Sequence, residues 1–235
     1  MSASFLLFFV TLQNNIKTHY GKRLLMHKIN IQTEYREQLK DRILNLAMQE
    51  FYVNGIKRVK MDDIAKKLVI SKRTLYEIYN KKEDLLLEGI KMSECLCDNH
   101  MEKFQKEKAP DVMDILVEFY KVQMEKVRTV NPLFFAELHK YSKIVNYLSK
   151  RHELRRNKSH MFFKRGIKDG YFRDDIDYSL VERFSNATME YVMDNKLYET
   201  YSMQHILYNV MFLFMRGFCT DKGLAIMDMK IKRLK

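Results

Sequence analysis

The sequence predicts an all-α protein, and three observations support this fold class. The 235 residues include only 2 Pro and 7 Gly, too few for the frequent turns of a β-sandwich or barrel. The chain is 46% apolar and 31% charged, so it can bury a sizeable core. Abundant Leu, Lys, Glu, Met and Ile favour helix, and from Glu34 onward apolar residues recur at three- and four-residue steps.

Residues 1–30 differ from the rest of the chain. Their apolar run, Ser4–Val10, is far shorter than the roughly 20 residues that cross a bilayer. No basic residue precedes this run and no small-x-small cleavage site follows it, which argues against the alternative of a signal peptide. We expect a flexible N-terminal arm, or sequence upstream of a true start at Met26, and no membrane partner.

The first periodic segment predicts a helix from about residue 34 that ends at Asn54-Gly55, because Gly accepts the left-handed conformation after a helix. A short second helix follows, with Asp62 and Asp63 in its first turn. After a break at Val69-Ile70, Ser71 is a suitable N-cap for a third helix. The inward positions of the first two helices are Leu39, Ile43, Ala47, Phe51, Met61, Ile64, Ala65 and Leu68.

The remainder of the chain also predicts helices. A long one runs from Glu83-Asp84 to about Glu107, and Pro110 and Asn131-Pro132 each begin another. Further segments cover about 141–168 and 180–191. The last long helix, Met203–Cys219, is apolar on nearly every face, so it must be covered on several sides. One side fits its own core and another fits a second subunit.

The charge distribution points to a phosphate-facing surface. The chain carries a net charge of +12, and residues 54–82 hold nine basic side chains against three acidic ones. Two short helices joined by a three- or four-residue break, resting on an earlier helix, have the proportions of a helix-turn-helix. The second helix of such a unit enters the major groove of DNA. The alternative is a basic amphipathic helix pair inside an all-α domain.

Residues 36–90 resemble the N-terminal domain of the TetR family of bacterial transcriptional regulators. The most specific match is the stretch Ser71–Leu85, which reads SKRTLYEIYNKKEDL, preceded by Met61–Leu68, which reads MDDIAKKL. The resemblance implies a homodimeric repressor with a helix-turn-helix domain at 31–90. It also implies a ligand-binding and dimerisation domain at 91–235, which agrees with the all-α fold class.

The resemblance also implies which residues contact double-stranded DNA. We expect these to be Lys60, Ser71, Lys72, Arg73, Thr74, Tyr76 and Lys82, with Lys72, Arg73 and Thr74 reading bases and Tyr76 and Lys82 contacting phosphates.

Three positions depart from the family pattern. Lys60 stands where Thr often caps the second helix, and a Lys side chain cannot cap. Val69 replaces the usual turn Gly, so the turn is either strained or broken differently. Tyr79 replaces the commoner Phe, a mild change if its hydroxyl reaches water.

The C-terminal part is rich in Phe, Tyr and Met, which can line an apolar cavity or form ordinary core. Family resemblance favours a cavity for an unknown small-molecule effector. The expected ligand-binding residues are Phe119, Gln123, Phe134, Tyr141 and Phe163. The expected dimer-interface residues are Leu180, Phe184, Tyr191, Val210, Phe214 and Gly217.

Other candidate sites have simpler explanations. Cys95 and Cys97 diverge by about 200° on a helix, so together with His100 they favour packing over metal binding. The sequence has no HExxH, GxSxG or phosphate-binding Gly loop, so we expect no enzyme, no catalytic residue, no metal and no cofactor. Eight basic side chains in 150–168 fit a solvated helix face, or an anion-accepting rim.

Three cysteines without framework spacing fit a reducing, cytoplasmic setting. The functional prediction is a ligand-responsive repressor that acts as a homodimer on a palindromic operator. The alternative is a helical small-molecule-binding or interaction protein whose DNA-binding head does not function.

Overall fold

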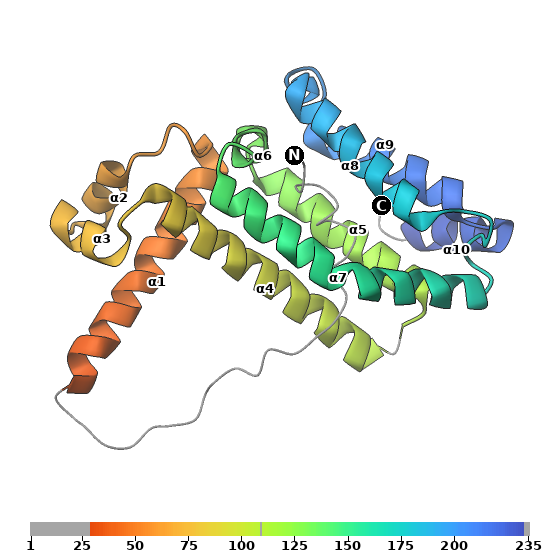
Figure 1. The fold of residues 1–235 in the computed structure, drawn as a ribbon, viewed down its shortest axis with the longest axis horizontal. Helices are drawn as coiled ribbons and strands as arrows, with labels where there is room; N and C mark the ends of the chain where they lie inside the picture. Colours follow the sequence, from red (N-terminus) through yellow and green to blue (C-terminus); the bar gives the residue numbers. More distant parts are fainter. Residues whose placement is uncertain (1–28, 109, 233–235) are drawn as a thin grey trace.

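The computed structural model describes residues 29–108 and 110–232, and the expected N-terminal arm lies almost entirely outside them. Within that part of the chain the fold is all-α (Figure 1). The N-terminal helices are α1 (Ile29–Asn54), α2 (Met61–Leu68), α3 (Lys72–Ile78) and α4 (Lys82–Lys108). The remaining elements are α5 (Val112–Thr129), α6 (Pro132–Leu138), α7 (Ser142–Lys168), α8 (Tyr178–Asp194), the short 3-10 helix η2 (Leu197–Glu199), α9 (Met203–Phe218) and α10 (Asp221–Lys232).

The predicted helices agree with these bounds, with two corrections. Helix α1 already begins at Ile29 and continues as one helix to Asn54. Helix α10 follows Met203–Phe218, so that helix is not the last one, and its buried residues Met227 and Ile231 pack into the C-terminal core. Gly55 takes the expected left-handed conformation, with φ 78°.

The helices lie in three groups along the molecule (Figure 1). Helices α2 and α3 sit with α1 at one end, α4 to α7 form the middle, and α8 to α10 lie at the other end. No helix in residues 29–108 and 110–232 combines the length and apolarity needed to cross a bilayer.

Helix α4 joins the head formed by α1 to α3 to the rest of the molecule. Where it crosses α1, a Cβ on Gly89 would lie 2.1 Å from the Met48 sulfur, so a larger residue there would require the Met48 side chain to shift. Lys40 of α1 also pairs with Glu88 of α4 at 2.7 Å. These contacts join α4 to α1 of the head.

The expected domain boundary near residue 90 falls inside α4. One buried cluster contains the head residues Leu75 and Leu85 and also Phe134 of α6 and Leu148 of α7. A second cluster joins α5 with α8, α9 and α10. The core of the head is therefore continuous with the first helices of the C-terminal part.

Candidate nucleic-acid interface

The turn between α2 and α3 keeps a left-handed residue although that residue is Val. Val69 has φ 56° and ψ 43°. Its N–H donates to the Lys66 carbonyl at 3.1 Å, and the Ile70 N–H donates to the Ala65 carbonyl at 3.1 Å, which satisfies carbonyls at the end of α2. Of the two expected alternatives, a strained turn or a different break between the helices, the structure shows the strained turn. The strain amounts to about 1–2 kcal/mol for a non-Gly residue.

The N-terminus of α3 is fixed by its first residues. Ser71 is extended (φ −68°, ψ 148°) and its hydroxyl accepts the Thr74 N–H at 3.0 Å. The hydroxyls of Ser71 and Thr74 also lie 2.8 Å apart. On the opposite side Leu75 is fully buried. The cap and the buried anchor together set the orientation of the exposed side chains between them.

Lys72 and Arg73 both face solvent. Their side chains are 63% and 89% exposed, and they pair with Asp62 and Glu77 respectively. Exposed ion pairs of this kind contribute less than about 1 kcal/mol, so a phosphate or a base edge can replace them at low cost. Tyr76 is also exposed, at 44%.

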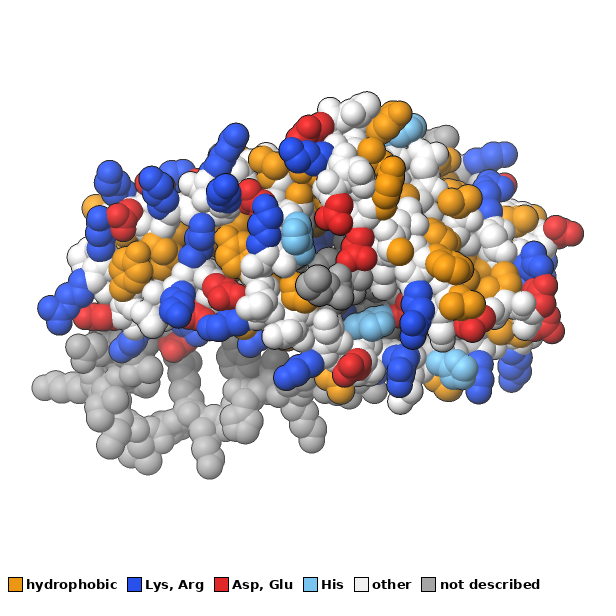
Figure 2. Space-filling view, turned by 45° about the horizontal axis from the view of Figure 1, so that its top comes forward, with side chains coloured by type: hydrophobic (Ala, Val, Ile, Leu, Met, Phe, Trp, Pro, Cys, Tyr) orange, Lys and Arg blue, Asp and Glu red, His pale blue; other side chains and the backbone are white. Residues whose placement is uncertain are grey.

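Nearby basic side chains extend this surface. Figure 2 shows Lys and Arg gathered over the end of the molecule that carries α2 and α3. The exposed members are Lys57, Arg58, Lys60, Lys66, Lys67, Lys72, Arg73 and Lys81. Lys60 makes no side-chain cap, as expected, and its backbone N–H donates to Asp63 at 3.4 Å.

Lys82 has a different environment from the one expected of a phosphate contact. Its ammonium group donates to the carbonyls of Ile56 and Val59 at 2.9 and 3.0 Å. Burial lowers its pKa. The side chain therefore holds the loop between α1 and α2, and a phosphate contact by Lys82 stays a prediction. Its neighbours in sequence could not reveal this, because the two carbonyls lie 23 and 26 residues away.

Tyr79 also needs a correction. Its side chain is only 3% exposed and its hydroxyl does not reach water. Burial, together with the nearby Glu88 carboxylate, raises its pKa. The Tyr79 side chain therefore lies among residues of α1 and α4, with Lys40 over its ring at 6.0 Å.

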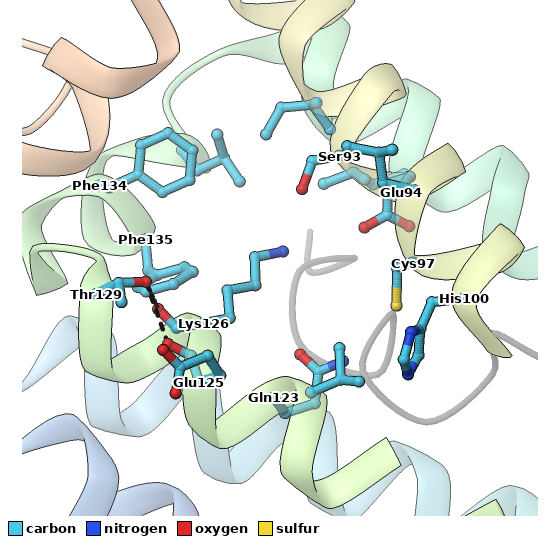
Figure 3. Close-up of a pocket in the computed structure, with 15 residues that line it drawn as sticks. Ser93, Glu94, Cys97, His100, Gln123, Glu125, Lys126, Thr129, Phe134 and Phe135 are labelled. Atoms are coloured by element: carbon cyan, nitrogen blue, oxygen red, sulfur yellow. Dashed lines mark hydrogen bonds between the residues drawn. The ribbon is translucent and has the colours of Figure 1, made fainter. Parts of the chain in front are cut away.

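A cavity of about 410 Å³ lies between α4, α5, α6 and α7 (Figure 3). Two expected ligand-binding residues, Gln123 and Phe134, line it. The other three do not. Phe119 belongs to the C-terminal core and Tyr141 packs at the start of α7. Phe163 stacks on Tyr178, with ring centroids 4.2 Å apart, beside a much smaller cavity.

A buried ion-pair network behind this cavity joins α4 to α7. The guanidinium group of Arg155 donates to Glu94 at 3.1 Å and to Asp98 at 2.7 Å, and Arg151 pairs with the same two carboxylates. Burial raises the pKa of both Glu94 and Asp98, opposed mainly by Lys126 and Arg151 respectively. Sequence reasoning placed both arginines on a solvated face or an anion-accepting rim. The sequence signal for this pairing is that the two acids and the two arginines are each four residues apart, so each pair lies on one face of its helix.

Helix α6 connects the cavity to the head. The Asn131 N–H donates to the Tyr52 carbonyl at 2.7 Å, and its side-chain amide donates to the Val53 carbonyl at 3.0 Å. Glu137 accepts the Lys57 N–H at 2.6 Å. Since Phe134 of the same helix lines the cavity, one short helix touches both the cavity and the end of α1.

Helices α8 and α9 present an exposed apolar face. Leu180, Phe184 and Tyr191 are 47%, 58% and 60% exposed, and Leu213 is 69% exposed. The other expected interface residues, Val210 and Phe214, are half-buried, while Gly217 is exposed with open space around its Cβ position. The metal-ligand candidates Cys95 and His100 have ordinary partners, Asn99 and Glu118.

Helix-turn-helix geometry with an exposed basic recognition helix defines a DNA-binding regulator fold, and comparisons with known proteins agree. Residues 43–88 match the family described as bacterial regulatory proteins, tetR family. No curated protein matches the sequence. The family match therefore covers the helix-turn-helix part of the chain, and the described residues share the overall fold of solved TetR-family transcriptional regulators.

Several solved structures share the fold at low sequence identity. A protein from Saccharomonospora viridis described as a transcriptional regulator, in complex with choline, has a TM-score of 0.62 and 19% identity, covering 78% of this chain and 99% of its own. A TetR family regulator from Agrobacterium tumefaciens has a TM-score of 0.60 and 14% identity, covering 79% and 100%. FadR from Bacillus subtilis in complex with stearoyl-CoA has a TM-score of 0.55 and 18% identity, covering 75% and 97%.

Proposed function

We propose that the chain is a homodimeric repressor that binds a palindromic operator through α3 and leaves it when a small molecule occupies the α4–α7 cavity. The observation that carries this proposal is the N-terminus of α3. There, Lys72, Arg73 and Thr74 lie between the Ser71 cap and the buried Leu75. Arg and Lys at this position of a recognition helix donate to guanine O6 and N7 in the major groove.

Dimerisation through α8 and α9 supports the palindromic operator. An exposed stripe containing Leu180, Phe184 and Leu213 is costly to leave in water, and a second copy of the same stripe would cover it. Two recognition helices related by a two-fold axis would then meet half-sites about one DNA turn apart. We place this activity in the cytoplasm, where the chain would meet its operator, and assign it no enzymatic step.

The ligand response has two routes from the cavity to the head. Helix α4 carries Glu94 at the cavity and Gly89 against α1. Helix α6 carries Phe134 at the cavity and Glu137 at the loop after α1. A ligand that shifts either helix would change the separation of the two recognition helices, and both half-site contacts would weaken together. Choline and stearoyl-CoA bound to proteins of this fold are consistent with an effector in the cavity.

The alternative of a ligand-binding protein with a non-functional head rests on Val69. This residue keeps the left-handed conformation that a turn Gly would take, and α3 retains its cap and exposed basic residues. The geometry therefore favours the DNA-binding function.

Gel-shift titrations with the DNA upstream of the chain's own gene test the proposal. We expect retardation at concentrations that leave random duplex of equal length unbound. Arg73→Ala should weaken operator binding by about 1–3 kcal/mol, roughly fivefold to 150-fold, because a base contact is lost. Arg128→Ala is the matched control, since Arg128 is also an exposed arginine paired with a glutamate, Glu125, but lies on α5. Equal retardation of operator and random DNA by the native chain would refute sequence-specific DNA binding.

A further inference from the structure

The α4–α7 cavity has a largely apolar wall. Most of this wall comes from α6, through Phe134, Phe135 and Leu138. Ile90 of α4 and Leu148 of α7 extend it. A ligand gains free energy by burying apolar surface against these side chains, so the body of the ligand is expected to be apolar.

Charged side chains that line the cavity already have partners. Glu94 accepts a hydrogen bond from Arg155 at 3.1 Å. Burial raises the pKa of Glu94, and the positive charge of Lys126 opposes this rise. His100 pairs with Glu118 at 2.8 Å. These pairs use the charges of the lining within the protein itself.

Three more polar residues of the lining are satisfied without a ligand. The Glu125 side chain is 67% exposed, so water solvates its carboxylate. The Thr129 hydroxyl donates to the Glu125 carbonyl at 3.1 Å and to the Lys126 carbonyl at 3.3 Å (Figure 3). The Ser93 side chain is hydrogen-bonded to Tyr52 of α1.

The side-chain amide of Gln123 differs from all these groups. Gln123 lines the cavity and is only 4% exposed, yet its amide makes no hydrogen bond with another residue of 29–108 and 110–232. In Figure 3 this amide points from α5 into the space between α5 and α4. A buried amide without a partner is costly, and an amide both donates and accepts hydrogen bonds. The polar end that best complements Gln123 therefore both accepts and donates.

The partners of the lining charges decide against an ionic ligand. An ion loses its hydration when it enters such a cavity, and only an unpaired opposite charge compensates this loss. Within the described residues, each charged group of the lining has a partner or is hydrated. An uncharged polar end avoids the cost of burying an ion and satisfies Gln123.

The volume limits the size of the occupant. About 410 Å³, at roughly 30 Å³ for each non-hydrogen atom, the share of a water molecule in the liquid, accommodates about 14 such atoms. A medium-length aliphatic amide or a compact aromatic amide fits this limit.

We propose that the effector is a small uncharged amphipathic molecule whose polar end, a carboxamide or a group that likewise donates and accepts, pairs with the Gln123 amide. Its apolar body lies against Phe134, Phe135 and Leu138. This inference rests on the proposed function, since it assigns a ligand class to the same cavity. The apolar body would press on α6, the helix that also bonds to the end of α1.

Isothermal titration calorimetry on the full chain at pH 7.5 tests the ligand class. The probes are octanamide, octanoate and octylammonium, which share an octyl-length apolar body and carry a neutral, anionic or cationic end. We expect octanamide to bind at least tenfold more tightly than the other two. Only its end can both donate to and accept from Gln123 without the loss of an ion's hydration.

Gln123→Met tests the proposed contact, because Met keeps the length of the side chain and removes the amide. This variant should bind octanamide at least fivefold more weakly, since the amide of the ligand is then buried without its partner. Thr129→Val is the matched control. It removes another polar group of the α5 lining, but one that already bonds within its own helix, so octanamide affinity should stay within twofold of the native value.

Melting curves of the unliganded Gln123→Met variant give a second readout. Because the Gln123 amide has no partner within the described residues, Met should leave the melting temperature unchanged or raise it. A lower melting temperature would show that the amide has a structural partner instead, and this would overturn the assignment of Gln123 to the ligand.

Three binding results would also overturn the inference. They are tighter binding of octanoate or octylammonium than of octanamide, equal affinity for all three probes, or no binding of any probe up to 2 mM. None of these affects the gel-shift comparison of operator and random DNA in the absence of ligand. Failure of the ligand class and failure of the proposed DNA-binding function are therefore distinguished.

Discussion

Replacing Val69 by Gly should stabilise the protein. Val69 has φ 56° and ψ 43°, a conformation in which the Cβ of an L-residue crowds the following carbonyl oxygen. Its side chain is 91% exposed, so removing it loses almost no buried apolar surface. The turn hydrogen bonds from Val69 and Ile70 use backbone atoms only, and the Gly variant keeps them.

The net gain is the difference between two backbone effects. Release of the left-handed strain is worth about 1–2 kcal/mol. The greater freedom of Gly in the unfolded chain costs about 0.5–1 kcal/mol. At the centres of both ranges the net gain is about 0.75 kcal/mol, which corresponds to a rise in Tm of about 1.5–3 °C for a chain of this length.

Thermal and urea unfolding of the Val69→Gly variant, followed by circular dichroism, measures this gain. Val53→Gly is the matched control, because Val53 is also exposed, at 60%, but lies in the last turn of α1. There Gly should lower the free energy of unfolding by a few tenths of a kcal/mol, since Val has the higher helix propensity. A Val69→Gly variant that is as stable as the native chain or less stable would refute the assignment of strain to this turn.

Two further predictions concern the interface and the contact between α6 and the head. Phe184→Asp should raise the dimer dissociation constant at least a hundredfold, since each copy loses about 1.5–3 kcal/mol of apolar burial. Analytical ultracentrifugation measures this constant, with Tyr35→Asp on α1 as the control at another exposed aromatic residue. An unchanged dissociation constant for Phe184→Asp would place the interface elsewhere. Glu137→Ala should speed backbone hydrogen exchange in residues 55–60 about tenfold, because the Lys57 N–H loses its carboxylate acceptor. Exchange mass spectrometry checks this against Glu125→Ala, and equal exchange in both variants would show that α6 does not restrain the loop.

The local features of the candidate interface could be predicted from the sequence. Ser71 caps α3 as expected, Lys72 and Arg73 are exposed, and Leu75 is buried. These outcomes depend on contacts within a few residues, because caps, turns and amphipathic faces are set by local backbone geometry. The left-handed turn at Val69 is one of the two alternatives that the sequence left open, and the structure decides between them.

The cavity was only partly predictable, because its lining depends on which helices meet. Gln123 and Phe134 face it, whereas Phe119, Tyr141 and Phe163 pack elsewhere. An apolar side chain on an amphipathic helix carries no local signal that separates a cavity wall from a filled core. Both environments satisfy the same hydrophobic pattern.

The sequence by itself determined the helices, the helix-turn-helix and the basic face of α3, because each depends on residues close together in the chain. Only the tertiary structure decided that Lys82 holds two backbone carbonyls and that Arg155 is buried against Glu94, 61 residues away. A charged side chain is well solvated at any exposed position, so the residues next to it in sequence do not show whether it has a buried partner. That partner is fixed only when α4 and α7 pack side by side and exclude water from the ion pairs between them.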